Sequence, residues 1–135
     1  MSATWMNAGI DYAAKVFLKK TAEVDLTLRL FTNNFTPLTT SEWADFTECS
    51  LGGYAAYTIT PADWTGSTVA GLATYTLPTV TFTLNPYAGG TTIYGYVLTI
   101  PGVTAVLAEL FGTPFAVPAG GALVNITPTY EDQKF

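Results

Sequence analysis

The first part of the chain follows the hydrophobic period of a helix. Its apolar side chains recur at positions i, i+4, i+7 and i+8, the spacing of one helical face: Ile10, Ala14, Phe17 and Leu18. Asn7 precedes this pattern and has a side-chain oxygen that can cap a helix. The sequence therefore predicts an amphipathic helix over residues 7–20.

The charged side chains of this segment agree with a helix. Asp11 lies near the N-terminal end, where the helix dipole favours an acid, and forms an i, i+4 pair with Lys15. Lys15, Lys19 and Lys20 lie toward the C-terminal end, where the dipole favours a base. Hydrophobic period, capping and charge thus predict the same element.

After the helix the pattern changes to the period of two that is typical of β-strands. The clearest alternation of apolar and polar positions is in residues 24–31 and 79–84, and residues 91–100 are aromatic and β-branched. Weaker patterns predict strands at 54–60, 68–77, 103–111 and 121–130. Seven or eight short strands with turn residues between them indicate an antiparallel β-sandwich or jelly roll.

Gly, Pro and Ser mark the connections between these strands. A short helical turn that begins at Ser41 is predicted over 40–46, a loop that carries Trp64 over 61–66, and a Pro-rich loop over 112–120. No linker divides the chain, so a single domain is predicted. Its parts are an N-terminal arm (1–6), the helix (7–20), the sandwich (24–130) and a charged tail (131–135).

The composition adds the expectation that part of the surface of this domain is covered by other subunits. Charged residues are 11% of the chain and apolar residues 49%, whereas typical soluble domains are about 25% charged. Obligate subunit interfaces are poor in charge and rich in aromatic residues. We therefore expect a homo-oligomer or an otherwise assembled subunit. The alternative is a monomer whose surface is hydrated by Thr, Ser and Asn.

The chain has few side chains that could catalyse a reaction. The chain contains no histidine, and residues 31–133 contain no Lys or Arg, so a Ser-His-Asp or Cys-His arrangement is excluded. Paired carboxylates could hydrolyse a glycoside, and the candidates are Glu42, Asp45, Glu48, Asp63 and Glu109. We interpret the first three as a solvated loop and Glu109 as an outward-facing strand residue, and we expect no enzymatic activity.

Metal ions, cofactors, nucleic acids and membranes are not expected as partners. Cys49 is the only cysteine, and the acids form no calcium-binding loop, although a calcium site between subunits stays open. Net charge is −5 and the basic cluster in the helix is small, which disfavours nucleic acid. Glu109 and several Pro and Gly residues interrupt the apolar segment 102–124, so no membrane span is predicted. No secretory signal is recognisable, and we expect a soluble protein made in the cytoplasm.

Two groups of residues are candidates for contact with a partner. Trp5 and Met6 in the arm precede the only basic cluster, which leads to the hypothesis of an attachment or inter-subunit contact at these positions: Trp5, Met6, Lys15, Lys19 and Lys20. The second group is aromatic, because Tyr and Trp side chains can stack on sugars. Core and interface packing use the same residue types, so both interpretations stay open.

Several segments follow one another in an order that resembles small structural proteins of tailed bacteriophages, which are associated with the capsid or decorate it: LRLFTNNFTP, GGYAAYTI, Trp64, LPTVTFTL, TIYGYVLT, AELF and AGGALVNITPTYE. The likeness covers nearly the whole chain and consists of strands and turns. It implies a non-enzymatic β-sandwich of a virion, assembled in the host cytoplasm, most simply a capsid decoration or cement protein. Its neighbours would be the major capsid or tail protein. The alternative is a tail-associated module that binds a carbohydrate or receptor.

Overall fold

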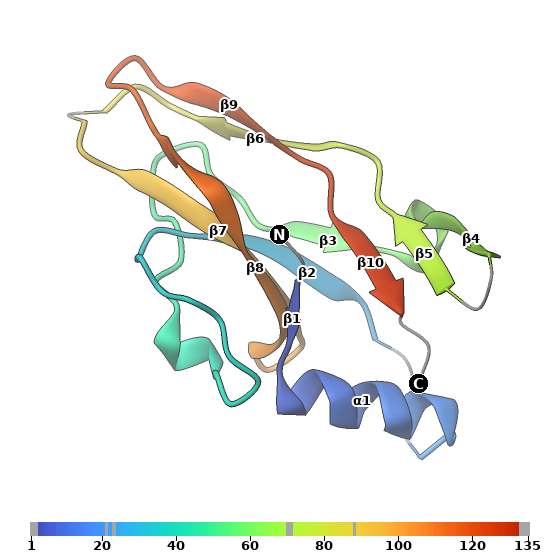
Figure 1. The fold of residues 1–135 in the computed structure, drawn as a ribbon. Coiled ribbons are helices and arrows are strands. Elements are labelled where there is room, and N and C mark those ends of the chain that lie inside the picture. Colours follow the sequence, from blue (N-terminus) through green and yellow to red (C-terminus); the bar gives the residue numbers. More distant parts are fainter. Residues whose placement is uncertain (1–2, 21, 23, 70–71, 88, 133–135) are drawn as a thin grey trace.

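The computed structural model describes residues 3–132 apart from residues 21, 23, 70–71 and 88 (Figure 1). The helical elements are α1 (Asn7–Phe17), η1 (Trp43–Asp45) and η2 (Pro61–Asp63). The strands are β1 (Thr4–Trp5), β2 (Leu26–Phe31), β3 (Tyr57–Ile59), β4 (Thr65–Val69), β5 (Leu72–Thr76), β6 (Val80–Leu84), β7 (Thr92–Ile100), β8 (Thr104–Ala116), β9 (Ala122–Ile126) and β10 (Thr129–Asp132).

The strands form two layers (Figure 1). One layer is a five-stranded sheet in the order β1-β8-β7-β2-β3, and the other contains the ribbon β6-β9 and the sheet β10-β5-β4. The two parts of the second layer are joined where the Leu77 N–H donates to the Pro128 carbonyl at 3.0 Å. All strand pairs are antiparallel. The chain is thus a mainly β sandwich with one N-terminal helix, although these orders do not establish jelly-roll connections.

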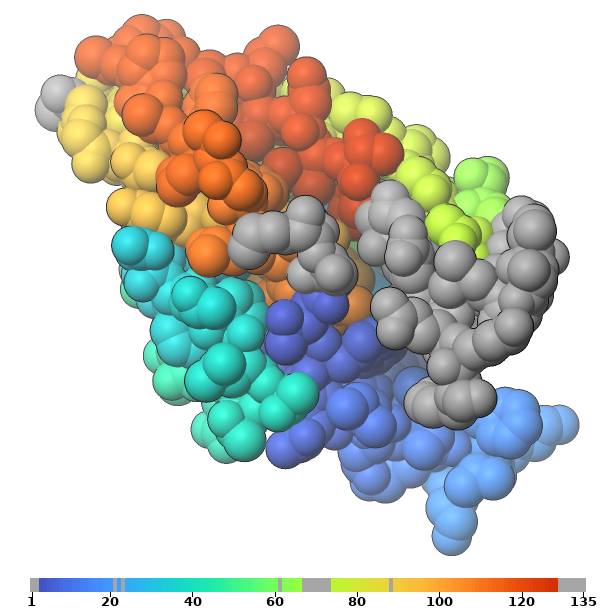
Figure 2. All heavy atoms as spheres, viewed as in Figure 1, coloured from blue at the N-terminus to red at the C-terminus, as the bar shows by residue number. Residues whose placement is uncertain are grey.

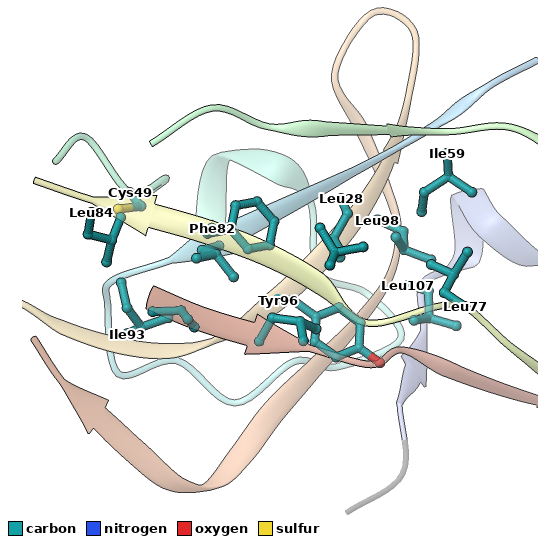
Figure 3. Packing of buried hydrophobic residues seen from close by; sticks show 14 of the residues in the cluster. Leu28, Cys49, Ile59, Leu77, Phe82, Leu84, Ile93, Tyr96, Leu98 and Leu107 are labelled. Carbon is teal, nitrogen blue, oxygen red and sulfur yellow. The ribbon is translucent and has the colours of Figure 1, made fainter. Parts of the chain in front are cut away.

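The main core lies between the layers and follows the predicted alternation. On β2, Leu28 and Leu30 are fully buried, and on β6 the residues Val80, Phe82 and Leu84 alternate with exposed threonines. Figure 3 shows Leu28 of the five-stranded sheet and Phe82 of the ribbon pointing into the same interior. Burying such apolar side chains supplies most of the driving force for folding, about 1.5–3 kcal/mol for each.

The outer face of the five-stranded sheet is covered as well. Phe31 points to this face and packs edge-on against Phe46, with ring centroids 5.0 Å apart, and Phe46 packs in the same way against Phe35 at 5.2 Å. Phe35 and Phe46 come from the segment that includes η1, and buried Met6 and Val97 join their cluster. The central strands therefore have apolar residues on both faces.

Several of the predicted strands have different limits in the structure. Residues 68–77 were expected to form one strand, but they belong to the hairpin β4-β5, in which Val69 pairs with Leu72. Residues 121–130 divide into β9 and β10 on either side of Pro128, which has no N–H to donate. The expected tail begins within β10, and residues 133–135 lie outside the described residues.

The prediction of a Pro-rich loop over 112–120 was wrong for residues 112–116, because β8 continues to Ala116. Gly95 pairs with Leu110 and Ile93 pairs with Phe115, so four residues of β8 lie opposite Tyr94 alone. Pro114 is tolerated within the strand because it falls in this bulge, where no ladder hydrogen bond is required.

Candidate functional site

The N-terminal arm docks on the sheet of its own chain. Trp5 pairs with Leu107 in β8, and the Met6 N–H donates to the Val106 carbonyl at 3.1 Å. Met6 is fully buried, so it offers no surface to a partner while the arm is docked. Trp5 is half-buried. The expected contact of Trp5 and Met6 with a partner stays a prediction. Of the two residues, only Trp5 has exposed surface with which to make such a contact.

Gly9 sets the distance between α1 and the sandwich. It is the only buried residue of the helix, and a β-carbon at this position would overlap the Val106 carbonyl oxygen and approach the Trp5 ring. Only glycine lets the helix backbone come this close to β8. The contact turns α1 so that Tyr12, Ala13 and Val16 lie toward the sandwich.

The stripe that the sequence pattern marks as the apolar face of the helix lies on its outer side. We call the four residues Ile10, Ala14, Phe17 and Leu18 the outer stripe. All four are exposed, Ile10 to 52%, Phe17 to 84% and Leu18 to 61%. In Figure 2 the helix, in blue, lies at one end of the molecule. The period of the stripe was predicted correctly, whereas its orientation is set by the contact of Gly9 with β8.

Both ends of α1 differ from the prediction. Met6 rather than Asn7 occupies the N-cap and makes no side-chain capping bond, and the Asn7 N–H donates to the Thr39 carbonyl at 2.8 Å. The helix ends at Phe17, because Lys19 adopts a positive φ of 57° and closes the end with hydrogen bonds back to the last turn. Lys15, Lys19 and Lys20 are exposed there.

A pocket of about 600 Å³ opens between α1 and the end of the sandwich. Its aromatic lining comes from Trp5, Tyr12, Trp64, Tyr75 and Tyr96. The rest of the lining is mainly aliphatic and includes Leu26 and Ile59, and no charged side chain of the described residues lines it. This size and lining are typical of sites that bind an apolar guest.

Several polar groups of the lining already have partners. The Tyr12 hydroxyl accepts a hydrogen bond from the Val24 N–H at 2.7 Å. The Thr60 hydroxyl donates to Asp63 at 3.2 Å. The Tyr96 hydroxyl donates to Glu109 at 2.8 Å. These three groups are therefore poorly placed to anchor a polar ligand such as a sugar.

Glu109 faces inward, and the expectation of an outward orientation was wrong. It lies directly opposite Tyr96 in the β7-β8 ladder, on the same side of the sheet, and is only partly exposed. Burial of the Tyr96 ring and the hydrogen bond to the Glu109 carboxylate both raise the pKa of the Tyr96 hydroxyl well above its usual value. The hydrogen bond between Tyr96 and Glu109 links β7 to β8, which suits a structural role.

The other candidate carboxylates also hold the fold together. Asp45 accepts a hydrogen bond from the Glu42 N–H at 2.9 Å in the capping box of η1. Asp63 accepts one from the Thr60 N–H at 2.8 Å beside η2. The η1 helix confirms the short helical turn predicted over 40–46, although its N-cap is Glu42 and not Ser41.

Glu48 and Arg29 form a half-buried cluster on the outer face of the sheet. Arg29 Nη1 lies 2.8 Å from Glu48 Oε1, and Arg29 Nε donates to the Thr99 hydroxyl at 3.0 Å. Glu48 also accepts a hydrogen bond from Tyr54 at 3.0 Å, and the guanidinium lies 5.5 Å from the centre of the Trp43 ring. Sequence reasoning missed this cluster, although Arg29 is the only base of the predicted sandwich.

The remaining chemical candidates are few. No group of three or more His, Cys, Asp or Glu side chains in the described part of the chain could hold a metal ion. Cys49 is a free, buried cysteine, and burial raises the pKa of its thiol. Among the described helices, none is long and apolar enough to cross a membrane.

Comparisons with protein-family models, with curated proteins and with solved structures find no match. The pocket and the outer stripe of α1 are therefore the features from which a function can be argued.

Proposed function

We propose that this chain is a non-enzymatic structural protein of a tailed-phage virion, most simply a capsid decoration or cement protein present in many copies. Its location would be the virion, and its neighbours the major capsid or tail protein. The observation that carries the proposal is the apolar surface at one end of the sandwich, where the pocket opens beside α1.

Exposure of the rim supports contact with another protein. Phe17, Val24 and Tyr75 line the pocket, and each is more than a third exposed. Contiguous apolar surface of this kind is typical of interaction sites, since monomeric proteins rarely expose large apolar patches. Fully buried interface centres are likewise poor in charge and rich in aromatic residues.

A particle lattice, which repeats the same surface many times, suits an apolar contact of this kind. A subunit that docks through apolar side chains on a particle lattice needs only modest affinity at each point if its copies are linked to one another, because linked contacts reinforce each other. The resemblance to capsid-associated proteins, noted from the order of strands and turns, supports the same setting.

The proposal is tested by rebinding purified protein to particles that lack it. Tyr75→Glu places a charge at the pocket rim and is expected to reduce occupancy on the particle about tenfold or more, because a buried charge without a partner is costly. Tyr57→Glu is the matched control, since Tyr57 and Tyr75 are exposed to 38% and 39% and only Tyr75 lines the pocket. Equal occupancy of the two folded variants would contradict the proposal.

A second candidate function is binding of a carbohydrate or receptor by a tail-associated module. The observation that favours it is the presence of Trp64 and Tyr75 in the pocket lining, because such rings can stack on sugars. This function predicts that Trp64→Ala abolishes binding to a glycan panel. It also predicts a few copies of the chain in each particle rather than many.

A further inference from the structure

We infer that the outer stripe of α1 is the contact between two copies of this chain, which pair their helices antiparallel about a two-fold axis. The inference rests on the proposed function, which it deepens by naming a second copy as one of the neighbours. It concerns the exposed side of α1, of which Phe17 also reaches the rim of the pocket.

The apolar side chains of α1 extend beyond the side of the helix that the sandwich covers. At about 100° per residue, Gly9, Tyr12, Ala13 and Val16 occupy an arc of about 100° toward the sandwich, and the outer stripe occupies a further arc of about 100°. A helix that is apolar on most sides is normally buried on most sides. An isolated helix of 11 residues is also only marginally stable. The outer stripe is therefore an apolar surface that a second helix can cover.

The order of charges beside the stripe selects the second copy and its direction. Asp11 and Lys15 flank the stripe on one side, 2.7 Å apart and both exposed. A two-fold axis that makes the helices antiparallel brings this flank against the same flank of the partner. Asp11 of each copy then lies beside Lys15 of the other. A parallel two-fold pairing would instead carry this flank to the opposite side of the interface, where the two flanks do not meet.

The same axis matches the apolar side chains by size. With the axis near residues 13 and 14, Ile10 of one helix lies opposite Phe17 of the other, and the small Ala14 lies at the crossing point. A small residue at the crossing lets two helices approach closely, at about 8–10 Å between axes. One operation thus places the small residue at the crossing and the large side chains on either side of it.

The experiment measures self-association of the full chain by sedimentation equilibrium. Wild-type protein is expected to form dimers, and Leu18→Ser to weaken dimerisation about tenfold or more. Leu123→Ser is the matched control, because Leu123 on β9 is exposed to 63%, as Leu18 is to 61%. A wild-type chain that stays monomeric, or equal effects of Leu18→Ser and Leu123→Ser, would overturn the inference.

Reversing the charge of Asp11 or Lys15 gives a second test. Its result is a comparison of each variant alone with the mixture of both, so it does not depend on the folding of one variant. Asp11→Lys and Lys15→Asp each place like charges across the axis and are each expected to weaken homodimers. An equimolar mixture of the two variants restores opposite charges at both contacts, so heterodimers should form in preference. A mixture that associates no better than either variant alone would reject the antiparallel pair.

Failure of this inference is distinguishable from failure of the proposed function. If the chain is abundant in particles but its association is insensitive to the outer stripe, the pairing is wrong and the function stands. If the stripe controls dimerisation but the chain is not found in particles, the pairing stands and the proposed function is wrong.

Discussion

At the scale of single residues, the placement of α1 depends on Gly9. The period of the apolar residues was readable from the sequence, but the sequence pattern treats Gly9 as a weak helix residue and not as a contact. Its role appears only when the Val106 carbonyl of β8, far away in the chain, comes against it. Tertiary contact thus decides which of two apolar faces lies inward.

Gly9→Ala tests this role. Alanine has the higher helix propensity, by about 1 kcal/mol, but its β-carbon would overlap the Val106 oxygen and force the helix away from β8. We expect the free energy of unfolding to fall by about 1–2 kcal/mol in urea titration, since overpacking costs about 1–3 kcal/mol. Gly112→Ala has open space and is expected to change it by less than about 0.5 kcal/mol. A more stable Gly9→Ala variant would show that the helix does not rest on this residue.

At the scale of elements, the cluster around Arg29 fastens the segment that carries η1 to the sheet. Strand β2 supplies Arg29, and Glu48 forms an isolated β-bridge with Phe31 of the same strand. The sequence predicted β2 and the turn at η1 separately, because both follow local rules. It could not predict that they are linked, since the partners are brought together by the packing of Phe31, Phe35 and Phe46.

Arg29→Gln tests this link. Removing the guanidinium leaves the half-buried Glu48 carboxylate with fewer partners, so we expect a loss of about 1–2 kcal/mol in the free energy of unfolding. Lys15→Gln, compared at a protein concentration where the chain is monomeric, breaks the exposed pair with Asp11 and is expected to cost about 0.3–0.5 kcal/mol. Equal losses in the two variants would indicate that the cluster contributes no more than a surface ion pair.

At the scale of the whole molecule, the scarcity of charge agrees with a sandwich that has apolar residues on both faces of its central strands. Composition and period two were sufficient to predict the fold class and most strand positions. The bulge in β8 and the hairpin β4-β5 depend on pairing between segments and were missed. The pocket was also missed, because its lining comes from parts of the chain that are far apart in sequence, such as Trp5 and Trp64.

The buried tyrosines make the whole fold sensitive to alkaline pH. Burial raises the pKa of Tyr54 and Tyr96 in the folded chain, whereas tyrosines in the unfolded chain lose their protons near about pH 10. Stability is therefore complete below about pH 10 and falls as the pH rises above it, by at most about 1.4 kcal/mol per pH unit for each tyrosine.

Tyr96→Phe checks this dependence in unfolding titrations between about pH 8 and pH 11. At the lower pH the variant is expected to be less stable by about 1 kcal/mol, because it lacks the hydrogen bond to Glu109. At the higher pH the difference should shrink or reverse, since phenylalanine has no proton to lose. A difference that does not change with pH would show that Tyr96 ionises equally easily in the folded and unfolded chains.

The central claim is that this chain is a multi-copy structural subunit whose apolar end is covered by neighbours. The most direct measurement is its copy number in purified particles, by quantitative mass spectrometry against the major capsid protein. We predict a number comparable with that of the capsid lattice, on the order of hundreds per particle, as expected for a multivalent contact. A few copies per particle, or none, would contradict the claim.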